Sequence, residues 1–340
     1  MIKIEFIKFL RENLSHFDIP RNKKILITGS SGFIGSYLVD ALTQLYPKNN
    51  NKIYGIDRIK GKNHKNFYFF KKDLYNLTRK DIPKIKYDYI IHLAGIPSPV
   101  YYKKYPLRTI FLNSELTRSL LEYSTKIRAK FIFFSSSEIY GDPFEKFIPT
   151  SESYNGNVST ISDRSCYDES KRMGETYSYV FNNFFNLNAK IIRPFNFYGQ
   201  GMRKNDERVI PRFFSQLLNN KKITVFSHGK QTRTYCHIYD AIVMILKIIF
   251  KGKKFVYNIG NPSEEISAKD LALKIAKITK SSQSNIRKIK YPSRYPSDEP
   301  MRRCPNIENF LKEFNFKPKI SLNVGLNLFY QYALSNFKKF

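Results

Sequence analysis

Short apolar runs alternate with longer amphipathic segments along the first 195 residues of the chain. Compact runs rich in Ile, Leu, Phe or Tyr predict buried β-strands at residues 23–29, 53–56, 87–95, 131–137 and 189–193. Helix-length segments separate these runs, and the first of them follows Gly35 and reaches about Tyr46. Strands that alternate with helices at this spacing predict an α/β fold with a parallel, doubly wound sheet.

The alternation fades after Pro194, where segments rich in Pro, Gly and Arg follow. A further strand is predicted at 254–259 and a helix at 267–279. This change of pattern predicts a second, smaller unit. We expect a larger domain of residues 23–195 plus 236–262, and a substrate-contacting lobe of residues 196–235 plus 263–340.

Residues 1–22 form an N-terminal extension ahead of the first strand. Ile7, Leu10, Leu14 and Phe17 recur there at steps of three and four residues, which predicts a short amphipathic helix that ends before Pro20. Charged residues inside this segment argue against a secretory signal. We expect the helix to pack on its own domain or on a partner subunit rather than on a membrane surface.

The composition is that of a globular chain. With 340 residues, of which 42% are hydrophobic, it can bury a sizeable core, and this excludes a disordered protein. No run reaches the roughly 20 apolar residues that span a bilayer, so we expect no transmembrane segment. Three isolated cysteines and five scattered histidines predict neither a disulfide framework nor a metal site. The isolated cysteines favour a reducing compartment, and we expect the protein in the cytoplasm.

The charge is strongly basic, with 58 Lys and Arg against 28 Asp and Glu and a net charge of +30. The lysines are interleaved with Asn, Ile, Phe and Tyr, and no block of five or six like charges occurs. Lys also outnumbers Arg about two to one, whereas base recognition relies on Arg. Codon bias in an A/T-rich genome explains this composition without a function, and a surface that attracts anionic substrates is the second interpretation. We expect no specific nucleic-acid partner.

The first candidate site is the glycine-rich turn after the strand at 23–29. Gly29 permits a tight turn, Gly32 lets the backbone approach a pyrophosphate, and Gly35 lets the next helix pack closely. The helix N-terminus adds free N–H groups and partial positive charge. Asp57 ends the following strand, where it would bind ribose hydroxyls and repel a 2′-phosphate, so NAD is favoured over NADP. The neighbouring Arg58 weakens this preference.

The second candidate site is the pair Tyr167 and Lys171, whose spacing of four places both on one face of a helix. A nearby ammonium group and a cationic nicotinamide both favour the phenolate, so Tyr167 can act as a base near neutral pH. This spacing is common by chance in a chain rich in Tyr and Lys. It gains weight because residues 135–138 (SSSE) precede it at the carboxyl end of a predicted central strand, where open α/β sheets bind ligands.

Longer blocks of sequence are more specific than either motif. They are SSSEIYGDP (135–143), ESYNGNV (152–158), RSCYDESKR (164–172), RPFNFYGQGM (193–202), NDERV (205–209), GKQTRTYCHIYD (229–240), NIGNP (258–262) and DEPMRRCP (298–305). In this order they resemble the extended short-chain dehydrogenase/reductase (NAD-dependent epimerase/dehydratase) family, and within it the UDP-glucuronate decarboxylases, from about Lys24 to Asn306. The resemblance implies a Rossmann-type domain that holds NAD, a C-terminal lobe that binds a nucleotide sugar, and a homodimer joined through two long helices.

The resemblance also implies a mechanism. Tyr167 would take the proton from the 4-hydroxyl of the sugar while NAD takes the hydride from carbon 4, carbon dioxide would leave, and return of the hydride would give UDP-xylose. Ser136 would hydrogen-bond the reacting oxygen, Lys171 would hold the nicotinamide ribose, and Ser137 and Glu138 would complete the catalytic group. Substrate-binding roles fall on Asn196, Arg208, Arg233 and Arg303, since arginine binds phosphate and carboxylate bidentately.

The cofactor-binding set that follows from the glycine-rich turn and the resemblance extends over several strand ends. Asp73 and Leu74 would border the adenine, unless Asp73 simply caps a following helix. The full set is Gly29, Gly32, Phe33, Ile34, Gly35, Asp57, Arg58, Asp73, Leu74, Leu93, Ala94, Gly95, Tyr167 and Lys171.

Glu138 separates the alternatives. Sugar 4,6-dehydratases carry Asp then Glu at positions 137–138, whereas this chain has Ser137, and simple 4-epimerases carry small or apolar residues where Glu138 stands. A 4-epimerase or another enzyme that oxidises carbon 4 of a nucleotide sugar stays open as the alternative, and a non-catalytic basic binding module on the same fold is a further one. Glu138 could also be a buried acid that backbone amides satisfy. His92 and His237 are expected to be structural.

Overall fold

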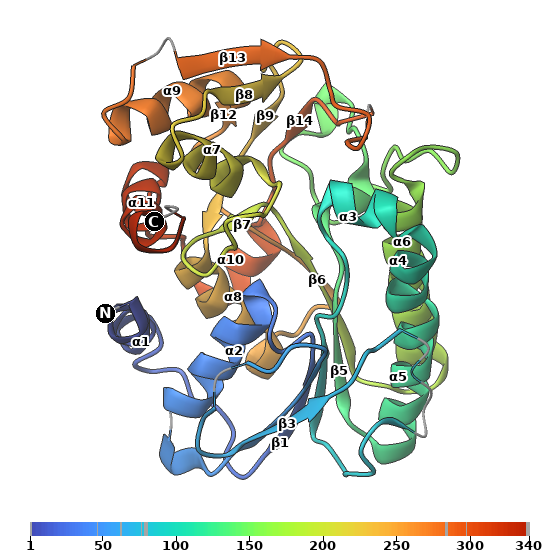
Figure 1. Ribbon diagram of the computed structural model, residues 1–340. Coiled ribbons are helices and arrows are strands. Elements are labelled where there is room, and N and C mark those ends of the chain that lie inside the picture. The colour runs from blue at the N-terminus through green and yellow to red at the C-terminus, as the bar shows by residue number, and fades with distance from the viewer. Residues whose placement is uncertain are drawn as a thin grey trace.

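The computed structural model describes residues 2–45, 47–61, 63–75, 77, 81–282, 285–296 and 298–337. It has a large part built on one central sheet and a smaller part at one end of that sheet, as Figure 1 shows. Helices cover both faces of the large sheet (Figure 1). The molecule is therefore a three-layered α/β structure with an added lobe.

The large sheet contains seven parallel strands in the order β11-β6-β5-β4-β1-β2-β3. This confirms the predicted doubly wound parallel sheet. The order reverses between β1 and β4, so a crevice opens at the carboxyl ends of these two strands. The strands are β1 Lys24–Thr28, β2 Lys52–Asp57, β3 Phe67–Lys71, β4 Tyr89–His92, β5 Lys130–Phe134, β6 Ala189–Pro194 and β11 Val256–Ile259.

Successive side chains of each strand alternate between two hydrophobic clusters, as the two-residue period requires. Ile25 and Ile27 of β1 join the cluster under α1, α2 and α8, whereas Leu26 joins the cluster under α4 and α5. The first face is covered by α1 Ile2–Asn13, α2 Phe33–Gln44 and α8 Ile238–Lys251. The second face is covered by α4 Pro106–Asn113, α5 Glu115–Ile127 and α6 Ser165–Phe184, and α3 Pro99–Lys104 packs on α4 and α6. Helix α2 ends before Tyr46, which lies outside the described residues.

The smaller part has its own hydrophobic cluster, which includes Phe213, Phe214 and Phe329. Its elements are α7 Val209–Leu218, β8 Ile223–Phe226, β9 Thr232–Arg233, β12 Ile266–Ser267, α9 Ala268–Ile278, β13 Ile286–Ile289, β14 Arg302–Arg303 and α11 Leu322–Phe337. Four elements lie between the two parts or return to the large sheet: β7 Phe197–Tyr198, β10 Cys236–His237, α10 Glu308–Phe314 and the short helix η3 Ser137–Tyr140. Two further 3-10 helices, η1 Pro47–Asn49 and η4 Glu145–Phe147, lie in loops of the large part.

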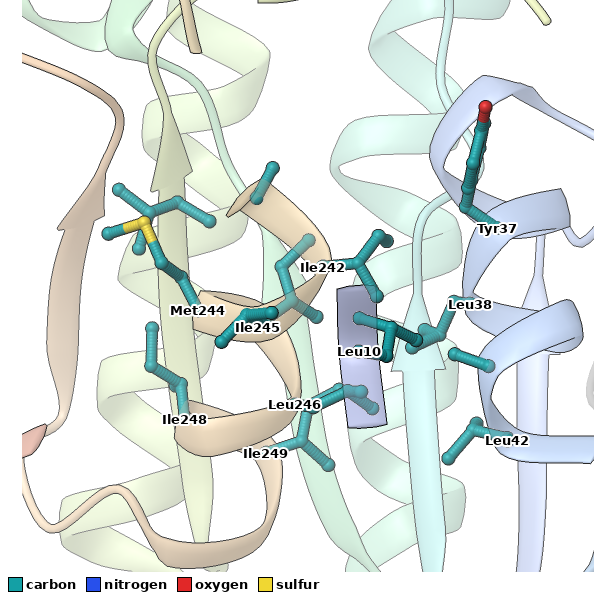
Figure 2. Packing of buried hydrophobic residues seen from close by; sticks show 14 of the residues in the cluster. Leu10, Tyr37, Leu38, Leu42, Ile242, Met244, Ile245, Leu246, Ile248 and Ile249 are labelled. Atoms are coloured by element: carbon teal, nitrogen blue, oxygen red, sulfur yellow. The ribbon is translucent and has the colours of Figure 1, made fainter. Parts of the chain in front are cut away.

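The N-terminal extension forms α1, which packs on α2 and α8 of its own chain. Phe6, Ile7, Leu10 and Leu14 are buried in the cluster shared with α2 and α8. Figure 2 shows Leu10 among Leu38, Ile242 and Leu246, which are aliphatic side chains of these two helices. Within the described part of the chain, no helix has both the length and the apolar character that a membrane crossing needs.

Substitution of Leu10 by alanine tests the packing of α1. Leu10 is fully buried, so we expect Leu10→Ala to lower the free energy of unfolding by about 2–5 kcal/mol through lost burial and the cavity that remains. Urea denaturation followed by circular dichroism measures the change. Ile4→Ala is the matched control, because Ile4 lies on the same helix with 75% of its surface exposed and its loss should change the value by about 0.5 kcal/mol or less. Equal effects of the two substitutions would contradict the packing of α1.

Candidate active site

A cleft of about 850 Å³ opens at the carboxyl ends of β1, β4 and β5 and reaches into the smaller part. One wall comes from the glycine-rich turn and the start of α2, and the opposite wall comes from the segment after β5 and from α6. The small-lobe side is lined by residues 205–213 and by Arg233 and Arg303. This is the position at which open α/β sheets bind their ligands.

The glycine-rich turn has the geometry of a dinucleotide cradle. Gly29 has φ +72°, and a Cβ atom at Gly35 would lie 2.2 Å from the carbonyl oxygen of Gly29, so neither position accepts a side chain. Gly32 is the N-cap of α2, and no side chain caps the helix there. The first N–H groups of α2 are therefore free to bind an anionic group such as a pyrophosphate. The turn fits NAD.

The predicted ribose-binding acid, Asp57, ends β2 and does not line the cleft itself. One carboxylate oxygen accepts a hydrogen bond from the backbone N–H of Ser31 at 3.0 Å, and the other accepts one from the N–H of Arg58 at 2.7 Å. Asp57 thus ties the glycine-rich turn to the end of β2. Arg58 does line the cleft.

The other predicted cofactor residues divide into two groups. Asp73 forms an ion pair with Arg108 and accepts a hydrogen bond from the backbone N–H of Tyr75 at 3.0 Å, and it does not line the cleft. Leu74 and Ala94 belong to the hydrophobic cluster under α4 and α5, and they do not line it either. The predicted residues that do line the cleft are Gly29, Gly32, Phe33, Ile34, Gly35, Arg58, Leu93, Gly95, Tyr167 and Lys171.

Tyr167 and Lys171 lie on one face of α6 and both line the cleft, with 4% of each residue exposed. Burial raises the pKa of Tyr167 to about 12, although a hydrogen bond with the Ser136 side chain lowers it. Burial also lowers the pKa of Lys171 to about 7, and its Nζ donates a hydrogen bond to the carbonyl of Phe134 at 2.7 Å. In the protein alone, the phenol form of Tyr167 is therefore favoured, contrary to the sequence-based expectation that the nearby ammonium would stabilise the phenolate.

Two neighbours of this pair were missed by the sequence reasoning. The ring of Tyr102 stacks on that of Tyr167, with centroids 5.2 Å apart and an angle of 17°. The amide of Asn113 donates a hydrogen bond to Ser170 Oγ at 3.0 Å, and its Oδ1 lies against Gly95 beside the Lys171 ammonium. Neither residue stands in a motif that a single sequence reveals.

Glu138 lies in a buried cluster of opposite charges. Its carboxylate forms ion pairs with Arg164, at the start of α6, and with Arg303 of β14. Glu299 connects the cluster further, because it binds Arg164 at 2.9 Å and Arg233 at 2.5 Å. Glu138 is satisfied by guanidinium groups, so the interpretation in which backbone amides satisfy it is wrong.

The charged groups of this cluster shift the pKa values of their neighbours. Burial raises the pKa of Glu299, but the surrounding Arg233, Arg164 and Arg303 outweigh burial and lower it overall. Burial, together with the charges of Arg233 and Arg164, lowers the pKa of Arg303. Arg164 and Glu299 had no role in the sequence-based prediction, although both stand within its quoted blocks, RSCYDESKR and DEPMRRCP.

The predicted substrate-binding residues follow one side of the cleft. Arg208 binds the neighbouring Asp206 at 2.6 Å, and its guanidinium lies 5.8 Å from the centre of the Phe33 ring, beside the glycine-rich turn. Asn196 has φ +44°, and its amide donates to the carbonyl of Thr234 at 3.0 Å. Arg233 and Arg303 belong to the charged cluster described above. The set thus extends from the dinucleotide turn to Glu138.

The two histidines of the sequence analysis have structural surroundings. His92 is buried, with Nδ1 2.7 Å from Thr28 Oγ1 and Nε2 3.0 Å from the carbonyl of Leu112. His237 caps α8 from within the core. Among the residues that the structure describes, no group of three or more His, Cys, Asp or Glu side chains is arranged to hold a metal ion.

A doubly wound parallel sheet with a glycine cradle after β1 and a Tyr-Lys pair facing its crevice defines a dinucleotide-binding enzyme of the short-chain dehydrogenase type. Residues 25–260 match the model of the NAD dependent epimerase/dehydratase family, and the chain belongs to this family. It is 34% identical over 310 residues to UDP-glucuronic acid decarboxylase 6 of Arabidopsis thaliana, a match that covers 90% of this chain and 88% of the relative.

Two solved structures extend the comparison. The UDP-glucuronic acid 4-epimerase of Bacillus cereus, in complex with UDP-glucuronic acid and NAD, is 28% identical with a TM-score of 0.77, and the match covers 91% of this chain and 98% of that one. The UDP-N-acetylglucosamine 4-epimerase of Methanobrevibacter ruminantium is 26% identical with a TM-score of 0.80, and the match covers 93% and 99% of the two chains.

Gly35→Ala tests the dinucleotide cradle. The added Cβ has to displace the carbonyl oxygen of Gly29, so the turn cannot keep its conformation and we expect affinity for NADH to fall at least about tenfold. NADH fluorescence on binding measures the affinity. Thr43→Ala is the control, since Thr43 lies near the other end of α2 and its hydroxyl bonds only to carbonyls of that helix. Unchanged affinity in Gly35→Ala would place the dinucleotide elsewhere.

Lys171→Met tests the effect of burial on the lysine. In an unfolded chain Lys171 has its ordinary pKa, whereas burial in the folded protein lowers it to about 7, so between these values the unfolded state binds more protons. Folding of the wild-type, dinucleotide-free protein is therefore penalised at pH 7 and relieved as the pH rises. We expect Lys171→Met to be stabilising relative to wild type near pH 7, with the difference shrinking by up to about 4 kcal/mol towards pH 10. Urea denaturation across this range measures it, and a difference independent of pH would contradict the burial effect.

Proposed function

We propose that the protein is an NAD-dependent UDP-glucuronate decarboxylase, which converts UDP-glucuronate to UDP-xylose and carbon dioxide. The observation that carries the proposal is the Glu138–Arg303 ion pair, which lies in the same cleft as Ser136, Tyr167 and Lys171. The similarity to the Arabidopsis thaliana decarboxylases over most of the chain supports it.

NAD would be held by the glycine-rich turn, with its pyrophosphate at the N-terminus of α2 and its nicotinamide end beside Tyr167 and Lys171. When bound, NAD accepts the hydride from carbon 4 of the sugar and later returns it. Lys171 would hydrogen-bond the ribose next to the nicotinamide. Asp57 would bind the adenosine ribose. Its carboxylate would then accept the ribose hydroxyls in addition to the hydrogen bonds that it accepts from the backbone N–H groups of Ser31, Arg58 and Ile59.

Tyr167 is the proposed general base. It takes the proton from the 4-hydroxyl of the sugar onto its phenolate oxygen, while the Ser136 hydroxyl hydrogen-bonds the same sugar oxygen. Because burial raises the pKa of Tyr167 to about 12, the phenolate needs compensating interactions. The hydrogen bond with Ser136 and the positive charges of Arg208 and Arg164 lower that pKa.

Loss of the carboxylate follows from the oxidation. The 4-keto uronate is a β-keto acid, so when the bond to the carboxylate breaks, its electron pair moves to an enolate whose oxygen stays at Ser136 and Tyr167. Arg303 would receive the uronate carboxylate by exchanging it for Glu138, because its guanidinium can bind two oxygens at once and both of its terminal nitrogens now bind that carboxylate. Glu138, with Ser137 as its neighbour, would take a proton from water and give it to carbon 5 of the enolate, while Arg303 and Arg164 hold its carboxylate in place. Tyr167 would return its proton to the sugar oxygen as the hydride returns to carbon 4. Asn196, Arg208 and Arg233 would bind the nucleotide end.

A 4-epimerase that keeps the carboxylate is the second candidate. The Bacillus cereus UDP-glucuronic acid 4-epimerase shares the fold and 28% of its residues with this chain. Both reactions begin with oxidation at carbon 4, so the early roles of Tyr167 and Ser136 do not distinguish them. The two enzymes differ in whether the carboxylate is lost or kept.

The oligomer and the compartment belong to the same proposal. We propose a homodimer formed through the long helices, because α6 exposes the large apolar side chains of Met173, Tyr179 and Phe184. The three cysteines, Cys166, Cys236 and Cys304, are free thiols, which suits a reducing compartment such as the cytoplasm.

Product analysis tests the proposal. Purified protein with UDP-glucuronate should release carbon dioxide and form UDP-xylose without added reductant, which mass spectrometry detects. Tyr167→Phe removes the base and should lower the rate by about 100-fold or more. Tyr68→Phe, at an exposed position of β3 outside the cleft, should leave it unchanged. A product of unchanged mass would favour the epimerase, and full activity of Tyr167→Phe would remove Tyr167 from the mechanism.

A further inference from the structure

The turn of residues 199–202, between β7 and α7, contains two glycines and lines the cleft. Gly199 has φ +148° and Gly201 has φ +92°, and both lack a side chain that would restrict the backbone. Gly201 and Met202 line the cleft, and the chain then leads to Arg208. One backbone hydrogen bond closes the turn, from the N–H of Met202 to the carbonyl of Gly199 at 3.4 Å, and its conformation depends further on contacts from outside it.

Gln200 supplies two such contacts. Its backbone carbonyl accepts a hydrogen bond from Tyr37 Oη at 2.9 Å, and its side-chain Oε1 lies 3.1 Å from His237 Nε2. The Nδ1 of His237 accepts from the N–H of Tyr239, so Nε2 carries the hydrogen and donates it to Gln200. Both bonds are buried, and their loss would leave polar groups unsatisfied.

Tyr37 is in turn held by the N-terminal extension. The Phe6 ring of α1 meets the Tyr37 ring edge to face, with centroids 4.8 Å apart and an angle of 90°, and it also lies 5.1 Å from the Tyr239 ring. Tyr37 contacts the turn directly as well, because a Cβ atom at Gly201 would lie 3.5 Å from its ring. An aromatic path thus leads from α1 to the wall of the cleft.

The same path continues to a predicted substrate-binding residue. The centre of the Phe33 ring lies 6.0 Å from the centre of the Tyr37 ring. The Arg208 guanidinium in turn lies 5.8 Å from the centre of the Phe33 ring. We propose that α1 is a positioning element of the nucleotide-sugar site: Phe6 fixes Tyr37, and Tyr37 fixes the Gly199–Met202 turn. The inference rests on the proposed function only in taking the ligand of this wall to be a uridine nucleotide.

Tyr37→Phe is the sharpest test, because it removes one hydroxyl and keeps the ring. Loss of about one hydrogen bond corresponds to a roughly fivefold effect, so hydrogen–deuterium exchange of peptides covering residues 199–202 should accelerate about fivefold. The Kd for UDP, measured by calorimetry with the NAD-loaded protein, should rise about three- to tenfold. With UDP-glucuronate as substrate, KM should rise by a similar factor while kcat stays within about twofold.

Phe6→Ala tests the contribution of α1. It should also raise the Kd for UDP. In the double variant with Tyr37→Phe, the fold-increase in this Kd should be smaller than the product of the two single fold-increases, because both substitutions act through one contact. Leu10→Ala is the matched control, since Leu10 is buried on the same helix among aliphatic side chains (Figure 2). It should lower stability and leave both the exchange at 199–202 and the UDP Kd within about twofold.

Two results would overturn the positioning role: unchanged exchange and UDP Kd in Tyr37→Phe, or equal changes in Leu10→Ala, which would mark a general loss of stability. Faster exchange with an unchanged Kd would overturn the link to the ligand. Wild-type protein that binds UDP but does not decarboxylate UDP-glucuronate would defeat the proposed function alone, because exchange and UDP affinity still decide the role of α1.

Discussion

The ion pair of Glu138 with Arg303 joins the two parts of the molecule across the cleft, and the ion pair of Glu138 with Arg164 anchors the same carboxylate to α6. Glu138 follows β5 of the large sheet, whereas Arg303 comes from β14 of the smaller part. Each of these charges loses water on burial, at a cost of several kcal/mol per ion, and only a close opposite charge offsets that cost. Moving the smaller part away from the sheet would leave Glu138 with a missing partner. The Glu138 carboxylate, whose side chain is 20% exposed, thus helps to hold β14 against the segment that follows β5.

The topology of the sheet determines which groups line the cleft beside Glu138. All seven strands are parallel, so the carboxyl ends of β1, β4 and β5 open on one edge and deliver the glycine-rich turn, Gly95 and Ser136 to one cleft. The tight packing of Gly35 on Gly29 brings the N-terminus of α2 to the same edge. The anion-binding N-terminus of α2 and the side chain of Ser136 are therefore close together because of the sheet topology. Neither is positioned by a long loop.

Local patterns were sufficient to predict much of this arrangement. The apolar runs predicted the strands on both sides of the switch point, and the spacing of Tyr167 and Lys171 correctly placed them on one helix face. No strand was predicted for the FYFF run that forms β3, an edge strand whose residues are only partly buried and lack an alternating pattern. The charged cluster was also missed in part, because Arg164 meets Glu299 across 135 positions of sequence and no local rule pairs them. The predicted cofactor set also includes Leu74 and Ala94, whose apolar side chains belong to the hydrophobic cluster beside the cleft.

Burial acts on the two central residues in opposite directions, and this limits when the site can work as a base. It raises the pKa of Tyr167 and lowers that of Lys171, so in the protein alone both residues tend towards their neutral forms. A phenolate at Tyr167 therefore depends on positive charge supplied from outside the pair, by arginines of the cleft wall and by whatever cation enters beside them. Arg208, one of the arginines whose charge lowers the pKa of Tyr167, also lines the cleft beside the glycine-rich turn, so an anion bound to Arg208 would weaken this effect. A cationic group that enters the cleft and displaces its water would therefore favour the phenolate more strongly than the arginines alone.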